Sequence, residues 1–128
     1  MKPSKKQRGD CYGRALDRLF KMKNVRGWRL VHGFAFVGGW VPGEHAWLRL
    51  PDGRVWDPTE NALVTAEKYE AICHATPVRE YTRLQAARLA SRHRHSGPWY
   101  DEKIGWRAGE QFRRQHLPGY AEFVDEAR

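Results

Sequence analysis

The chain has 128 residues, of which 41% are hydrophobic and 30% are charged, and its formal net charge is +8. This length and composition predict one folded domain with a buried core, and they exclude an intrinsically disordered chain. No apolar run approaches the roughly 20 residues that a membrane-spanning helix requires, and two cysteines are too few for a disulfide framework. We therefore expect a reduced, cytoplasmic protein.

The first half of the chain predicts a helix followed by three strands. Residues 1–9 form a basic stretch with no apolar segment behind it, so we expect a flexible arm and not a signal peptide. Asp10 is a suitable N-cap for a helix from Cys11 to Met22, whose apolar residues recur every three or four positions. Segments rich in β-branched and aromatic residues then predict strands at 28–37, 45–50 and 54–57.

The second half predicts more helix than strand. The pattern favours a helix around 65–70, a strand from Ala71 to Val78, a basic helix from Arg79 to Arg92, and a helix from Arg107 to His116 before a polar tail. This order predicts a single α+β domain over residues 1–128, with an N-terminal helix packed on a small antiparallel sheet. Residues 10–95 would form its core and residues 96–128 a C-terminal extension of helices.

Cys11 has the position of an activated nucleophile. The first turn of a helix carries unpaired N–H groups and the positive end of the helix dipole, which favour a thiolate over a thiol. The same N–H groups can stabilise an oxyanion. Gly13 leaves space for a substrate beside the thiol. The alternative is that Cys11 is simply a small buried residue of the helix.

A hairpin is expected to bring His45 and Asp57 together. A three-residue loop at Pro51-Asp52-Gly53, ending in a left-handed glycine, places Trp47 opposite Asp57. Since side chains alternate along a strand, His45 and Asp57 then share one face as diagonal neighbours, roughly 7–8 Å apart at the backbone. A two-residue loop at Asp52-Gly53 would place them on opposite faces. The carboxylate would orient the imidazole, and the imidazole would activate a thiol.

Three short motifs carry a family resemblance. They are Cys11-Tyr12-Gly13-Arg14-Ala15-Leu16, then Glu44-His45-Ala46-Trp47, and last Asp52-Gly53-Arg54-Val55-Trp56-Asp57-Pro58-Thr59. Together, over about residues 10–60, they resemble the transglutaminase-like branch of the papain-like cysteine enzymes, and especially its small bacterial or phage-type members.

The resemblance implies a catalytic triad of Cys11, His45 and Asp57 that works through a thioester and needs no metal or other cofactor. Family members often carry a glutamine upstream of the cysteine as an oxyanion donor, which here points to Gln7, with the backbone N–H of Cys11 as the second donor. Tyr12, Gly13 and Trp47 are the expected substrate-binding residues. The expected substrates are proteins, peptides or small amides, by hydrolysis or by transfer to an amine.

Two other kinds of site have some support in the sequence. For zinc, the chain offers scattered ligand types without paired spacing, namely Cys11, His32, His45, Asp57, Cys73, His74, His93 and His95. For nucleic acid or an acidic protein partner, it offers a basic stretch followed by two aromatic residues, namely Arg79, Arg83, Arg88, Arg92, His93, Arg94, His95, Trp99 and Tyr100. A non-catalytic basic binding module is therefore the alternative to the enzyme.

Overall fold

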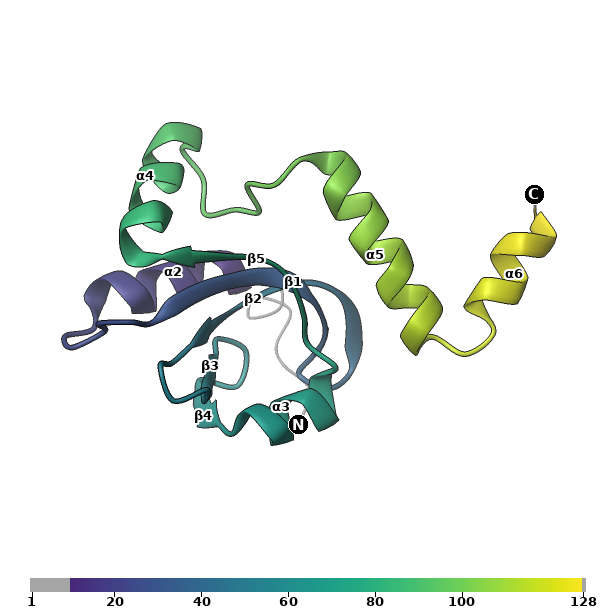
Figure 1. Ribbon diagram of the computed structural model, residues 1–128, viewed down its shortest axis with the longest axis horizontal. Helices are drawn as coiled ribbons and strands as arrows, with labels where there is room; N and C mark the ends of the chain where they lie inside the picture. The colour runs from purple at the N-terminus through teal and green to yellow at the C-terminus, as the bar shows by residue number, and fades with distance from the viewer. Residues whose placement is uncertain (1–9, 128) are drawn as a thin grey trace.

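A five-stranded antiparallel sheet with the order β4-β3-β2-β1-β5 forms the centre of the structure, a computed structural model that describes residues 10–127 (Figure 1). The strands are β1 (Arg29–Val37), β2 (Val41–Arg49), β3 (Val55–Asp57), β4 (Ala62–Val64) and β5 (Thr76–Thr82). The helices are α2 (Cys11–Lys21), α3 (Ala66–Cys73), α4 (Arg83–His93), α5 (Glu102–His116) and α6 (Tyr120–Ala127). The α+β class predicted from the sequence is confirmed.

Both faces of the sheet are covered, because β1 and β2 carry apolar residues at consecutive positions and not only at alternate ones. Ala46 and Leu48 of β2 belong to a cluster with α2 and α4, whereas Trp47 belongs to a second cluster with α3. The first cluster contains Ala15, Leu16, Leu19, Leu30, Ala46, Leu48 and Ala86, and the second contains Val31, Ala35, Trp47, Val55, Tyr69 and Cys73. The residues that follow His45 in β2 are thereby packed on both faces of the sheet.

The first helix matches the prediction in extent but not in its cap. α2 ends at Lys21, one residue before the predicted end. Asp10 occupies the N-cap position, yet its side chain makes no capping hydrogen bond, and its carbonyl oxygen accepts from the Arg14 N–H at 3.0 Å. Cys11 is therefore the first helical residue, as expected.

The hairpin between β2 and β3 has the predicted register. Leu48 pairs with Trp56, the Leu50 N–H donates to the Arg54 carbonyl at 2.8 Å, and Gly53 is left-handed with φ +92°. This is the three-residue loop, so His45 and Asp57 do reach the same face of the sheet.

β2 begins four residues before the predicted start at His45. The segment from Val41 pairs with β1, and Pro42 lies opposite Phe36. β3 pairs with β2 only at Leu48 and Arg49, so among the described strands nothing pairs with the outer edge of β2 near Pro42. An edge without a partner tolerates a residue that has no N–H to donate.

The predictions for residues 71–92 were wrong in their boundaries. The helix α3, capped by Thr65, continues to Cys73 and ends at His74 in a left-handed conformation, so the predicted strand from Ala71 starts only at Thr76. The predicted basic helix from Arg79 starts only at Arg83. The reason is a reciprocal capping box between Thr82 and Gln85, which sets the helix start and leaves 79–82 in β5.

The C-terminal segment holds more helix than expected. Asp101 accepts a hydrogen bond from the Lys103 N–H at 2.7 Å and so starts α5 five residues before the predicted Arg107. The strand β4 and the helix α6, which replaces the expected polar tail, were not predicted.

Phe112 is the large buried side chain by which helix α5 packs on the sheet. Phe112 is 1% exposed, and its ring centroid lies 6.1 Å from that of Phe34 and 5.5 Å from that of Phe36 in β1. α6 follows α5 at the C-terminal end of the chain (Figure 1), and an ion pair between Arg114 and Asp125 at 3.0 Å joins the two helices. None of the helices within residues 10–127 is long and apolar enough to span a bilayer.

Gly33 is required where β1 lies between β2 and β5. It pairs with His45 on one side, and an added Cβ would lie 2.2 Å from the Thr76 carbonyl oxygen on the other. We predict that Gly33→Ala lowers the free energy of unfolding by about 2 kcal/mol, because β5 must move away. Urea unfolding measures this. Gly43→Ala is the control, since nothing lies within 4 Å of its added Cβ. Equal stability of the two variants would contradict the close approach.

Candidate active site

His45 and Asp57 form a buried pair. His45 Nε2 lies 2.9 Å from Asp57 Oδ2, and the two residues are 0% and 1% exposed. His45 comes from β2 and Asp57 from the end of β3, so the loop that sets the hairpin register also sets this contact. The sequence-based expectation that the two side chains meet is realised in the structure.

Asp57 is fixed by hydrogen bonds on both of its carboxylate oxygens. Oδ1 accepts from the N–H groups of Thr59 at 2.7 Å and Glu60 at 3.1 Å. Oδ2 accepts from the hydroxyl of Tyr69 in addition to its contact with His45. Burial raises the pKa of Asp57, but its hydrogen bonds and the positive charge of His45 outweigh burial and hold that pKa below the usual 3.8. Asp57 is therefore a charged, oriented acceptor.

Cys11 lies near enough to the imidazole to change its pKa. Burial tends to lower the pKa of His45, but the bond to Asp57, the Cys11 thiol and the charges of both groups raise it from 6.5 to about 9. His45 Nδ1 is buried and has no hydrogen bond of ordinary geometry to any described residue. With Nε2 turned to Asp57, Nδ1 is the atom left to exchange a proton with the sulfur.

The cysteine itself is buried. Cys11 is 4% exposed and makes no disulfide. As the first residue of α2 it lies among N–H groups that have no partner inside the helix. The structure thus brings the three predicted triad residues together from one helix and two strands.

The residues beside Cys11 have specific neighbours. The hydroxyl of Tyr12 donates to Glu44 at 3.3 Å. A Cβ on Gly13 would lie 2.9 Å from Asp10 Oδ1 and 3.7 Å from Ser96 Oγ, so this glycine allows a close approach within the protein. That is a different reason from the substrate space expected from the sequence. Gln7, the expected oxyanion donor, lies outside the described residues.

Trp47 supports the histidine from inside the core. It is 3% exposed, and its ring centroid lies 6.0 Å from His45 and 5.9 Å from Tyr69. Its neighbours are core residues of the α3 face. Contact of Trp47 with a substrate stays a prediction.

Tyr69 is a member of the site that sequence reasoning missed. It lies on α3, 12 residues after Asp57, and is 5% exposed. In the sequence it is one aromatic residue of a short helical pattern, which is typical of a core position. The predicted role of Asp57 as an orienting carboxylate could have indicated a donor nearby, because a carboxylate that is removed from water needs hydrogen-bond partners. It could not have indicated which residue supplies it.

The zinc-ligand types do not form a metal site among the described residues. Within residues 10–127 no three histidine, cysteine or acidic side chains are grouped so that they could hold a metal ion. His74 stacks on His116 at 4.8 Å, and His93 lies 5.8 Å from His95. Burial, the largest cause, raises the pKa of Cys73 to about 12, which makes it a poor thiolate.

Comparisons with known proteins found no relative whose function could be compared with this site. The chain matches no family model, no curated protein and no solved structure among those with which it was compared.

Removing the Tyr69 hydroxyl should weaken the site. We predict that Tyr69→Phe lowers the free energy of unfolding by about 2 kcal/mol, because a buried carboxylate loses a donor. Tyr81→Phe is the control, since its hydroxyl has no hydrogen bond to a described residue and its change should stay within about 0.5 kcal/mol. Urea unfolding of both variants at neutral pH measures the difference, and equal values would contradict a role for the hydroxyl.

The raised pKa of His45 predicts a pH-dependent stability. Because the folded pKa is about 9 and the unfolded value is 6.5, the contribution of His45 is fully present below pH 6.5 and is lost as the pH rises through 9. The difference in the free energy of unfolding between wild type and His45→Gln should therefore shrink across this window. A difference that stays constant from pH 6 to 9 would argue against a protonated His45 in the folded protein.

Proposed function

We propose that the protein is a cysteine-dependent hydrolase or acyl transferase that acts on peptide, isopeptide or other amide bonds. The observation that carries the proposal is the buried His45–Asp57 contact with Cys11 acting on the same imidazole from the first residue of α2. A thiol, a base and a carboxylate in this order are what nucleophilic acyl transfer needs.

The proposed reaction follows from the roles of the three groups. The thiolate of Cys11 attacks the amide carbon, and the backbone N–H of Cys11 donates to the oxyanion that forms. The imidazolium of His45 gives its Nδ1 proton to the leaving amine as the C–N bond breaks, which leaves a thioester on Cys11. His45 then takes a proton from water, the hydroxide attacks the thioester, and the acid and the thiolate are released. An amine in place of water would give acyl transfer, and hydrolysis is the first choice.

The substrate entrance that we propose is the cleft beside Tyr12. The partner of its hydroxyl, Glu44, lines a cleft of about 500 Å³ together with Tyr100 and Trp106. Glu44 precedes His45 and Tyr12 follows Cys11, so both reacting residues have a chain neighbour at or next to this cleft. We assign the cleft to the substrate, which would enter over the Tyr12–Glu44 contact.

The arrangement is also what the family resemblance implies. A cysteine that opens a helix packed on an antiparallel sheet, a histidine on one strand and an aspartate at the end of the next strand fit a transglutaminase-like enzyme of the papain-like superfamily. A cytoplasmic location of a small bacterial or phage-type member is part of the same proposal.

Thiol alkylation tests the activated pair. We predict that iodoacetamide at neutral pH modifies Cys11 at least about tenfold faster in wild type than in His45→Ala, because the imidazolium that stabilises the thiolate is lost. Cys73 is the internal control, since its raised pKa of about 12 keeps it slow in both proteins. Peptide mass mapping separates the two sites. Equal labelling of Cys11 in both proteins would contradict an activated pair.

Capture of the thioester tests the chemistry. Wild-type protein incubated with a peptide library should gain mass on Cys11, and hydroxylamine should remove that mass because it cleaves thioesters. Cys11→Ser, which cannot form a thioester, is the matched control. An adduct that resists hydroxylamine, or one that also forms on Cys11→Ser, would contradict the proposed intermediate.

A further inference from the structure

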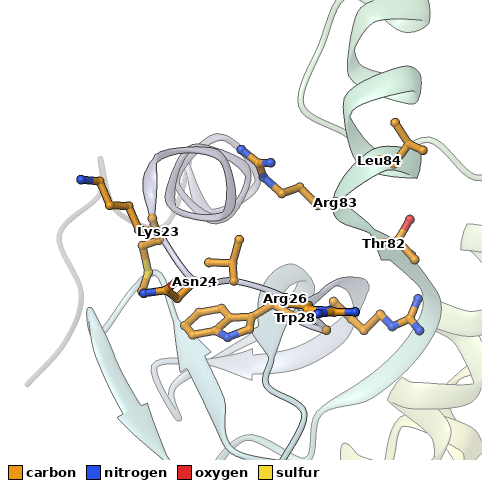
Figure 2. Close-up of a pocket in the computed structure, with 11 residues that line it drawn as sticks. Lys23, Asn24, Arg26, Trp28, Thr82, Arg83 and Leu84 are labelled. Carbon is orange, nitrogen blue, oxygen red and sulfur yellow. The ribbon is translucent and has the colours of Figure 1, made fainter.

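A second cleft lies at the opposite end of α2 from the triad. It is formed by the connection from α2 to β1, residues 22–29, and by the junction of β5 and α4, residues 82–84, and its volume is about 880 Å³ (Figure 2). Cys11 is the first residue of α2 and the cleft begins just after its last residue, Lys21. A helix of this length separates the two places by about 16 Å, at a rise of about 1.5 Å per residue. The cleft is therefore a separate site.

The lining of this cleft is strongly cationic. Lys23, Arg26, Arg29 and Arg83 contribute to it, and no carboxylate does. Glu80 interacts electrostatically with Arg29 from outside the cleft lining. Its carboxylate accepts two hydrogen bonds from Arg49, of 2.7 and 2.9 Å. Most of the positive charge in the cleft is thus left for an external anion.

The cleft is also rigid on one side and aromatic at its base. Val25 and Trp28 are joined by a backbone hydrogen bond of 3.0 Å, and Gly27 between them is left-handed, with Pro51 so close that an added Cβ would lie 2.9 Å from it. Trp28 is half-buried against the core and lines the cleft together with Asn24 and Arg26 (Figure 2). A flat ring in a cationic cleft suits stacking of a nucleobase.

Further arginines lie on α4 beyond the cleft. Arg83 is anchored at the start of the helix, where its guanidinium donates to the Phe20 carbonyl at 3.2 Å and lies 5.9 Å from the Phe20 ring. Arg88, Arg92 and Arg94 follow and are exposed. An anion with charges spaced along a chain would contact more of these groups than a single phosphate could.

From these observations we infer that the cleft binds one nucleotide of a single-stranded nucleic acid, with the base on Trp28 and the phosphates on Arg26, Arg29 and Arg83. The cations account for the phosphates, and the indole accounts for a planar base, which neither an acidic peptide nor a lipid headgroup supplies. This inference is independent of the proposed catalysis, so binding should persist in Cys11→Ser.

Fluorescence anisotropy of a labelled oligothymidine tests the site in the full-length protein. We expect Arg26→Glu to weaken binding at least about tenfold and to lower the dependence of log affinity on log salt by about 0.7 for each phosphate that the variant no longer binds. Arg107→Glu, the same charge reversal at an exposed position on α5, is the matched control and should have a clearly smaller effect. Equal effects of the two reversals would overturn the assignment to this cleft.

The role of the base is tested separately. Trp28→Ala should weaken binding by about tenfold, and Trp28→Phe should retain most of it, because a phenyl ring still stacks. Inorganic polyphosphate should compete poorly, since it lacks bases. Circular dichroism and thermal unfolding establish that the Trp28 variants are folded. Arg26 is exposed, so the binding measurement on Arg26→Glu tests the cleft even if the Trp28 variants do not fold. Competition by polyphosphate as strong as by oligothymidine would contradict a nucleotide site.

Discussion

The buried contact between His45 and Asp57 is the constraint on which the rest of the site depends. A charged pair with almost no exposure costs free energy unless its hydrogen-bonding capacity is used. Here the carboxylate accepts from two backbone N–H groups, from Tyr69 and from the imidazole. These bonds come from the turn after β3 and from α3, so the second face of the sheet is as necessary to the site as the helix that carries Cys11.

Two sites of different chemistry lie at the two ends of helix α2. Its first residue lies beside the imidazole, while the chain beyond its last residue lines a cationic cleft with Trp28. Between these two ends, Ala15, Leu16 and Leu19 are buried in the core beside β1 and β2. A proposed acyl-transfer site and an inferred nucleotide site are therefore held at a fixed separation by one packed element, and each can be changed without touching the other.

The hairpin geometry was predictable from sequence because Pro51-Asp52-Gly53 allows few loops and alternation then fixes the faces. The partner of Asp57 on α3 was not, since Tyr69 meets it only when a later helix packs on the sheet. The start of α4 was predicted four residues too early for a local reason. Thr82 and Gln85 form a capping box that fixes this start, and the spacing of apolar residues carries no information about such a cap. Likewise, the sequence indicated Gly13 as space for a substrate but did not indicate the close approach of the Asp10 side chain to it.

The central claim is that Asp57 and Cys11 hold His45 as an imidazolium, and titration of the histidine ring by NMR tests it most directly. Wild-type His45 should titrate with an apparent pKa near 9, and this pKa should fall in Asp57→Asn and in Cys11→Ser, since each removes a group that raises it. His45→Gln assigns the resonance. A wild-type pKa at or below the ordinary 6.5, unchanged by either substitution, would contradict the account.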